Sequence, residues 1–517
     1  MIKKLKKIDF KLLGIITIIV TILCNAFLQM HYSSDTFVLM DLGYMNYPQK
    51  YFLLDGRIIS AAVCFLAGIL HIPYNAYIIS MDVIAVFFVC ISIYVTYITI
   101  CNIIQPKTNS KKCLCFMASF VLILNQFSLE YLLFPESAVM CLGQMLCVIS
   151  ASLVLSNNKH KYLKIGLMLF IAVFCYQGVL NIFPALALLF IFLNQIKNKS
   201  SIKDNIKEIF KKLLIPAIIC ILAIIINVIA VKIGCKLLND SSYRQIKLLD
   251  FESVLLRLKT IGIYLDKIWN QSLEMLPKYT NWIILIITLI LLSLNNLRLK
   301  TIPKYLFLLV VIFISCIVPM FFLNTGPCGR VNIPISQIIG ISLLFIIATL
   351  ENLNTKKYLK YISYIFIICT FILNSIMILR NSNEHIAANK VDENMGKSIK
   401  YILEKYESDT GNKITKFSYV YDPDPQQYAP GIKHIGSLTE RKLACSWCIS
   451  QAMNYYCDRK MEKVRMPIKI YIEKIKRKAL EDHIPIIMDD TLLEISKRMK
   501  MNKPEKILEI GTAVGYS

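Results

Sequence analysis

The sequence predicts an all-α membrane protein that crosses the bilayer about eleven times. Its 517 residues are 56% hydrophobic and only 18% charged. The apolar residues gather into runs of about 20 residues, the length that a helix needs to cross about 30 Å of hydrocarbon. These runs lack the alternation typical of barrel strands, and lipid accepts only helices or closed barrels. Helices are therefore the predicted spanning elements.

The distribution of basic residues predicts the orientation of the chain. The net charge is +24, and much of the Lys and Arg lies in short segments between apolar runs, beginning with Met1–Lys7. Such segments face the cytoplasm by the positive-inside rule, so the charge does not indicate a nucleic-acid partner. No small-residue cleavage site follows the first apolar run. We therefore expect an uncleaved first span with a cytoplasmic N-terminus, rather than a signal peptide.

The number of crossings follows from the apolar segments and their flanking charges. A cytoplasmic N-terminus and an outside C-terminal segment require an odd number, so one of twelve candidates should not span. The short segment 58–72 is the expected re-entrant or half-membrane helix, and a split 75–104 is the alternative. The candidates lie near 12–30, 58–72, 75–104, 114–132, 136–155, 163–176, 178–195, 213–234, 281–297, 305–324, 331–351 and 362–380.

Composition divides the chain into three parts. Residues 1–380 form the multi-spanning domain, and residues 381–465 are charged and mixed, with turn signals, which predicts a small mixed α/β module outside the membrane. Residues 466–517 differ again in composition. Most of the 17 cysteines are dispersed in apolar runs, where thiols behave as small hydrophobic groups. Cys445, Cys448 and Cys457 lie in the polar module, and a disulfide, a metal half-site and unbonded thiols all remain open.

The loop after the first span carries candidate catalytic residues. Asp35 and Asp41 follow that span, while Asp55 and Arg57 lie where the chain re-enters the membrane. A carboxylate just outside the bilayer can take a proton from an acceptor hydroxyl, and an arginine can hold a lipid phosphate. The alternative is an ordinary solvated loop.

Further polar residues interrupt apolar runs that the predicted topology directs to the same outer side. These are Glu136, Tyr176 with Gln177, and Arg330. Ionisable residues at membrane depth are costly and usually face a cavity, so their convergence predicts a polar site. Each residue alone could equally be a snorkelling anchor or a helix cap.

Together these residues carry a family resemblance over about residues 1–465. The chain resembles the bacterial Gtr-type glucosyltransferase-domain membrane proteins, which glucosylate O-antigen and related polymers. That family is similar to the GT-C class, whose members use a polyprenyl-phosphate sugar donor on the outer side of the membrane. The motifs are Ser34-Asp35, Asp55-Gly56-Arg57, Phe134-Pro135-Glu136-Ser137, Tyr176-Gln177 and Gly329-Arg330.

The resemblance implies a role for each of these residues. An early carboxylate would be the general base, with Asp35 ahead of Asp41 and Asp55. Family members often carry an acidic pair where this chain has Ser34-Asp35, so the identity of the base stays open. The other roles would be donor-phosphate binding by Arg57 and Arg330 and substrate binding by Glu136, Tyr176 and Gln177.

The resemblance also implies the setting of the reaction. The expected location is the bacterial cell membrane, and the expected partners are membrane lipid, a polyprenyl-phosphate sugar and a cell-surface glycan acceptor. No metal or further cofactor is expected, because arginines can stabilise a lipid-phosphate leaving group. Two other classes of function remain as alternatives, a flippase or transporter for lipid-linked sugars and a non-catalytic scaffold. A transporter should show related halves and broken helices.

The last part, residues 466–517, resembles the start of a class I O-methyltransferase. Its S-adenosylmethionine loop would contain Glu509, Gly511 and Gly515, which follow a strand-like apolar segment as in Rossmann-like folds. The chain stops before the later strands of such a fold. We therefore expect an incomplete Rossmann-like fragment that neither binds S-adenosylmethionine nor methylates a substrate.

Overall fold

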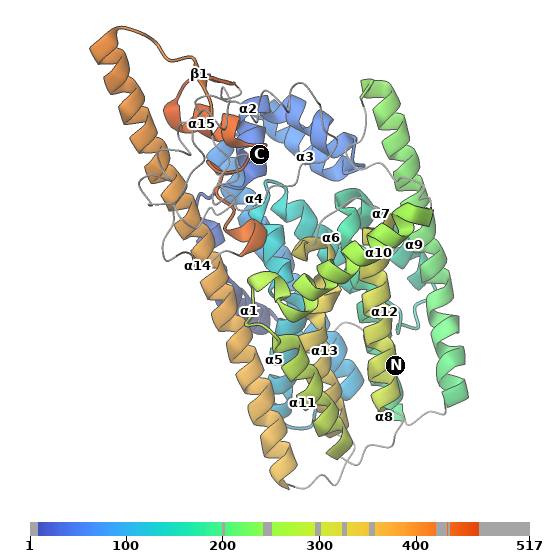
Figure 1. The fold of residues 1–517 in the computed structure, drawn as a ribbon. Helices are drawn as coiled ribbons and strands as arrows, with labels where there is room; N and C mark the ends of the chain where they lie inside the picture. The colour runs from blue at the N-terminus through green and yellow to red at the C-terminus, as the bar shows by residue number, and fades with distance from the viewer. Residues whose placement is uncertain are drawn as a thin grey trace.

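We describe the fold from a computed structural model (Figure 1). The structure describes residues 9–198, 202–240, 251–294, 301–322, 328–350, 357–419, 432 and 435–464. The expected Rossmann-like fragment at 466–517, with Glu509, Gly511 and Gly515, lies outside these residues.

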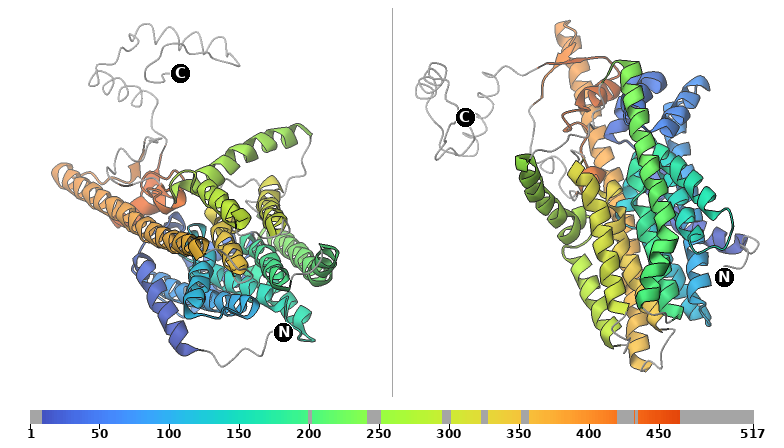
Figure 2. Two further views of the ribbon diagram at one scale, coloured as in Figure 1. Left: turned by 90° about the horizontal axis from the view of Figure 1, so that it is seen from below. Right: turned by 90° about the vertical axis from the view of Figure 1, so that its right-hand side faces the viewer.

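The described residues are mostly helical, as the sequence predicts. Most helices run roughly along one direction, with α9 and α14 on opposite sides of the bundle (Figures 1 and 2). The longer helices are α1 (Phe10–Leu23), α2 (Ser34–Pro48), α3 (Ile58–Ile69), α4 (Tyr74–Ile104), α5 (Asn109–Ile123), α6 (Ser137–Leu153), α7 (Lys161–Cys175), α8 (Ile182–Asn198), α9 (Ile202–Leu238), α10 (Phe251–Leu265), α11 (Thr280–Leu294), α12 (Thr301–Phe322), α13 (Ile333–Leu350), α14 (Lys357–Thr410) and α15 (Ile449–Cys457). Short helical turns that the site uses are η3 (Phe127–Leu133), η4 (Gln177–Val179), η7 (Gly329–Val331) and η9 (Gly436–Leu438).

Several helices have the length and composition of membrane spans. Five described segments qualify, and a sixth if α5 and η3, which meet at 57°, form one broken span. The five lie at Tyr74–Ile104, Gln177–Lys197, Lys207–Leu238, Ile333–Leu350 and Lys357–Thr410. The predicted total of about eleven crossings therefore stays a prediction.

The predicted number of membrane crossings depends on the segments 58–72 and 75–104, which correspond to α3 and α4. α4 is one continuous helix of 31 residues, so the run at 75–104 is not split. α3 has only 12 residues and rises about 18 Å, which is too short to cross about 30 Å of hydrocarbon.

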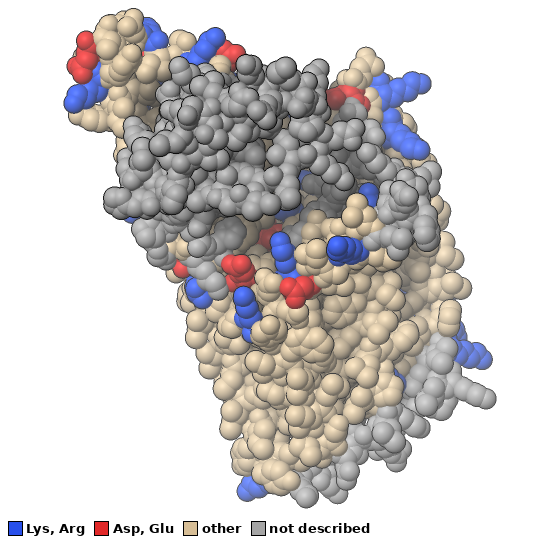
Figure 3. Space-filling view, in the orientation of Figure 1, with Lys and Arg blue, Asp and Glu red and all other residues tan. Residues whose placement is uncertain are grey.

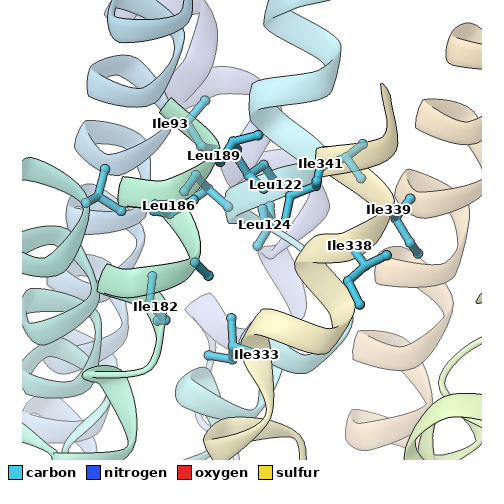
Figure 4. Packing of buried hydrophobic residues seen from close by; sticks show 14 of the residues in the cluster. Ile93, Leu122, Leu124, Ile182, Leu186, Leu189, Ile333, Ile338, Ile339 and Ile341 are labelled. Carbon is cyan, nitrogen blue, oxygen red and sulfur yellow. The ribbon is translucent and has the colours of Figure 1, made fainter. Parts of the chain in front are cut away.

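The centre of the bundle is a continuous apolar core in which α13 is enclosed. Every one of the 18 residues of α13 is buried, and it packs against α5 and α8 (Figure 4). The labelled residues are Ile93, Leu122, Leu124, Ile182, Leu186, Leu189, Ile333, Ile338, Ile339 and Ile341. α13 can be apolar all round because it has no face toward solvent or lipid.

Close packing of α13 on α5 depends on Gly340. A Cβ at this position would lie 2.6 Å from the Cα of Leu122 and 2.7 Å from its backbone nitrogen. Small residues allow such close approach of helix backbones in membrane proteins.

We expect Gly340→Ala to destabilise the protein by about 1–3 kcal/mol, because the added methyl pushes α13 away from α5. Thermal unfolding of the purified protein measures this. Gly14→Ala is the control, since a Cβ there meets no atom within 4 Å. Equal unfolding temperatures for the two variants would contradict the proposed packing.

The outside of the bundle is apolar along much of its length. α9 carries a run of exposed isoleucines and leucines, and only 17% of its apolar window is buried in the protein. In Figure 3 a broad region below the mid-height row of charges is free of them over most of its area. Such a surface suits contact with lipid, and the chain is a membrane protein by these features.

The last long helix connects the bundle to the C-terminal module, by which we mean residues 381–465. α14 has 54 residues and runs without interruption through the predicted boundary at 381. The module is small and mixed α/β in its described part, since α15 accompanies a two-residue parallel pair of β1 (Lys416–Phe417) and β2 (Glu462–Lys463). The module therefore begins as an extension of the helix that leaves the bundle.

Candidate functional site

Polar residues converge where four apolar helices are interrupted. The interruptions lie before α3, before α6, between α7 and α8, and before α13. Turn η7 contacts both η3 and η4, and η3 also contacts α6. Residues that are far apart in sequence therefore meet in one polar region, as the sequence hypothesis requires of a site.

The first pair in this region is Arg57 with Glu136. A guanidinium nitrogen of Arg57 donates to Oε1 of Glu136 at 3.0 Å, and the two residues are only 6% and 2% exposed. Arg57 also lies over the ring of Tyr176, 4.8 Å from its centroid. Three of the predicted site residues thus form one buried cluster. A buried ion pair of this kind costs desolvation energy, so its presence favours a functional role.

The second pair is Arg330 with Glu130, a residue that the sequence analysis missed. Oε2 of Glu130 accepts from the backbone N–H of Arg330 at 3.0 Å and lies 3.8 Å from its guanidinium. Arg330 also lies over the ring of Phe134, 4.5 Å from its centroid. A Cβ on Gly329 would come 3.1 Å from the Glu130 carboxyl carbon, so glycine permits this approach.

Asp35 lies at the start of α2, close enough to both pairs to interact electrostatically with Glu136 and Arg330. Ser33 caps this helix by accepting from the backbone N–H of Thr36. The Tyr47 hydroxyl donates to Oδ1 of Asp35 at 3.3 Å. Burial, followed by the charge of Asp35, raises the pKa of Tyr47 well above its ordinary value. Tyr47 therefore remains a hydrogen-bond donor to the carboxylate.

The competing carboxylates take different positions. Oδ2 of Asp55 lies 3.9 Å from the Arg57 guanidinium, so Asp55 belongs to the cluster. Asp41 is exposed, and no hydrogen bond or ion pair recorded for the described residues joins it to the cluster. Six residues along a helix place Asp41 on a different face from Asp35.

Gln177 supports the turn that carries Asp55 and Arg57. Its side-chain amide donates to the backbone carbonyl of Asp55 and, at 3.0 Å, to Oδ1 of Asn227. Asn227 in turn donates to the backbone carbonyl of Gly56 at 2.8 Å. Gly56 has φ +73°, a conformation that favours glycine. Asn227 was missed because a single amide inside the long apolar run of α9 gives no sequence signal of its partner.

Several buried polar atoms around the two arginines have no hydrogen-bond partner among the described protein atoms. They are Nε of Arg57, Oε2 of Glu136 and the hydroxyls of Tyr131 and Tyr176. Buried polar groups are usually paired, and unpaired ones are expensive. A polar ligand in this region could satisfy them.

The C-terminal module packs against the helix that carries Asp35. The Ser34 hydroxyl donates to Oε2 of Glu440 at 2.9 Å and lies 3.9 Å from the sulfur of Cys445.

Cys445, Cys448 and Cys457 are free thiols in the structure, and no metal-binding group of three or more His, Cys, Asp or Glu side chains occurs among the described residues. A hydrogen bond from Cys448 lowers the pKa of Cys445.

Comparison with known proteins identifies the family. The model of the family described as glucosyl transferase GtrII matches residues 56–326. The match includes Arg57, Glu130 and Glu136, whereas Asp35 and Arg330 lie outside it. None of the curated proteins compared with the chain matches it. Because the family match covers more than half of the 517 residues, the chain belongs to the GtrII glucosyltransferases.

Proposed function

We propose that the protein transfers glucose from a polyprenyl-phosphate donor to a cell-surface polysaccharide or glycolipid, on the outer side of the bacterial cell membrane. The observation that carries this proposal is the meeting of Arg57 and Arg330, each beside its own glutamate, in one polar region of an otherwise apolar bundle. Guanidinium groups suit phosphate, which they can bind with two hydrogen bonds. A lipid-linked phosphate would reach such a region from the surrounding bilayer.

The proposed reaction needs one base and one group that stabilises the departing phosphate. Asp35 takes the proton of the acceptor hydroxyl, whose oxygen bonds to C1 of the glucose. The bond between C1 and the phosphate oxygen breaks, and polyprenyl phosphate leaves with the electron pair. Arg57 and Arg330 stabilise the charge that develops on this phosphate. No further cofactor is needed for this chemistry, because the donor already carries the activated sugar.

The remaining predicted residues have supporting roles in this scheme. Glu136 and Tyr176 orient Arg57, to judge from their contacts with its guanidinium. Gln177 holds the turn that precedes Arg57. Asp55 is close to Arg57 and would compete with the donor phosphate for it. We therefore assign the base to Asp35, whose carboxylate lies at the start of α2 and accepts a hydrogen bond from the Tyr47 hydroxyl.

The choice of donor tests this proposal. Membranes containing the protein are supplied with radiolabelled polyprenyl-phosphate glucose and an acceptor extract, without nucleotide sugar. We expect the label to enter the acceptor fraction, and UDP-glucose alone to give no transfer in membranes that lack the lipid donor. Labelling from UDP-glucose alone would contradict the proposed donor. Movement of lipid-linked glucose across sealed vesicles without transfer would support the flippase alternative instead.

A further inference from the structure

A second buried polar group lies beside the proposed site and takes no part in the reaction described above. Nε2 of His31 lies 3.0 Å from Oδ2 of Asp82, and Nδ1 of His31 lies 3.1 Å from Nε2 of His385. Nδ1 of His385 lies 2.6 Å from the backbone carbonyl oxygen of Leu438. Asp82, His31 and His385 are each at most 1% exposed. We call these three side chains the His–Asp relay.

The hydrogen-bond geometry fixes how many protons the relay holds. A carbonyl oxygen can only accept, so Nδ1 of His385 must carry a proton toward Leu438. The other two contacts, between the two imidazoles and between His31 and Asp82, also need one proton each. The complete relay therefore contains three protons and has no net charge, wherever the protons lie along it.

A fourth proton on any atom that makes these contacts would break the relay. It would set two N–H groups against each other between His31 and His385, or two donors against each other between Nε2 of His31 and Oδ2 of Asp82. On Oδ1 of Asp82, the carboxylate oxygen outside these contacts, it would instead leave the buried relay with a net positive charge. Burial, followed by the neighbouring His31 and the positive charge of Lys442, lowers the pKa of His385 and so disfavours this proton. Cys141 faces Asp82 from α6 as a buried thiol. Phe27 stacks on His385 at 5.5 Å between ring centroids and excludes water from that side.

The relay fixes the loop from which Asp35 projects. Beside the contact of His31 with His385, the backbone N–H of Tyr32 donates to Oδ1 of Asn389 at 2.5 Å. His385 and Asn389 are four residues apart and share one face of α14. The loop is thus attached twice to α14 immediately before the cap of α2, and Asp35 follows two residues after the capping Ser33.

We propose that Asp82, His31 and His385 are positioning residues for the transferase, holding Asp35 in place only while the relay has its three protons. This inference rests on the proposed function of Asp35. It assigns no contact with the substrate to the relay. A fourth proton, taken up in acid, releases the loop from α14 and withdraws the base from the acceptor. The relay thereby sets a lower pH limit for transfer that protonation of Asp35 alone would not set.

The variant His385→Gln tests this, because glutamine can hydrogen-bond to His31 but cannot be protonated. Transfer and thermal unfolding of the purified full-length protein are measured from about pH 8 down through the acid side of the ordinary histidine range, because burial lowers the pKa of His385 well below its ordinary value. For the wild type we expect kcat to fall about tenfold per pH unit on the acid side and the unfolding temperature to fall with it. In the variant both acid-side losses should disappear, with KM for the donor unchanged at pH 7. His71→Gln, at an exposed histidine, should match the wild type.

The two measurements separate failure of the relay from failure of the proposed function. If transfer occurs but His385→Gln and the wild type have the same pH profiles, the relay proposal is overturned. If no variant transfers glucose but His385→Gln still removes the acid-side loss of stability, the relay stands and the transferase proposal fails.

A second pair of variants serves if His385→Gln does not fold. Asp82→Asn keeps a donor toward Nε2 of His31 and reproduces the state in which the aspartate carries the proton. Asp82→Leu removes that contact. We expect Asp82→Asn to unfold near the wild-type temperature at pH 7 and Asp82→Leu to unfold at a clearly lower one. Equal temperatures for the two would overturn the relay.

Discussion

Asp35→Asn should lower the rate of glucose transfer by about 10²–10⁴-fold, the usual contribution of a general base. Asparagine has the same shape and can still interact with the Tyr47 hydroxyl, but it cannot take the proton of the acceptor. Expression and the unfolding temperature should therefore remain close to those of the wild type. Transfer of labelled glucose from polyprenyl-phosphate glucose, measured in membranes with equal amounts of each variant, gives the rates.

Asp41→Asn is the matched control for this experiment. Asp41 lies on the same helix as Asp35, and its replacement by asparagine removes the same charge. Its side chain is exposed and makes none of the described contacts with the cluster around Arg57. We expect it to transfer glucose at the wild-type rate. Equal loss in the two variants would show an effect of the charge of α2 as a whole. Full activity of Asp35→Asn would remove Asp35 from the mechanism and leave Asp55 as the candidate base.

Glu136→Ala should destabilise the protein by about 3–5 kcal/mol, because it leaves the buried Arg57 guanidinium without its main counter-ion. Among the described residues, Asp55, at 3.9 Å, is the acidic neighbour that would remain at ion-pair distance. The unfolding temperature of the purified variant, or its yield in membranes, measures the loss. The exposed pair Lys397 and Glu393 on α14 provides a control, since Glu393→Ala should change stability by less than about 0.5 kcal/mol.

The double variant Arg57→Met with Glu136→Met separates folding from function. Replacing both members of a buried ion pair by apolar side chains is often neutral or stabilising. We therefore expect the double variant to recover most of the stability that Glu136→Ala loses, yet to transfer no glucose because a phosphate-binding guanidinium is gone. Transfer at the wild-type rate by a stable double variant would refute the role of Arg57.

The helical architecture could be predicted from sequence because its cause is local. Long apolar runs specify helices wherever lipid is the solvent. The number of crossings could not be fixed in the same way, since it depends on how short segments such as α3 are placed by tertiary contacts. The boundary at residue 381 was placed by composition. Composition changes where the helix leaves the apolar region, but the helix itself continues to Thr410.

The candidate site was partly predictable for a related reason. Arg57, Glu136, Tyr176 and Arg330 interrupt apolar runs and are conspicuous, so their shared location could be proposed from topology. Their partners were harder to find. Glu130 precedes Glu136 by six residues and lacked a motif of its own, although an acidic residue in an apolar stretch was a usable signal.

The relay could not have been derived from sequence. Its members lie in the first loop, in the first third of α4 and in α14, and their separations along the chain are 51 and 354 residues. Each alone is an ordinary polar residue. Only tertiary packing reveals that their donors and acceptors match, because no local pattern encodes contacts over such distances.

Because α14 is uninterrupted, the number of residues in it sets the rotation of the C-terminal module about the helix axis. Each residue of a helix adds about 1.5 Å of rise and about 100° of rotation. One residue inserted in α14 between the bundle and His385 would turn the module and its docking face by that angle, away from Ser34 and α2. Seven residues, close to two full turns, would restore the direction but raise the module by about 10 Å. Changes of length in this helix can therefore preserve the direction or the height of the module, but not both.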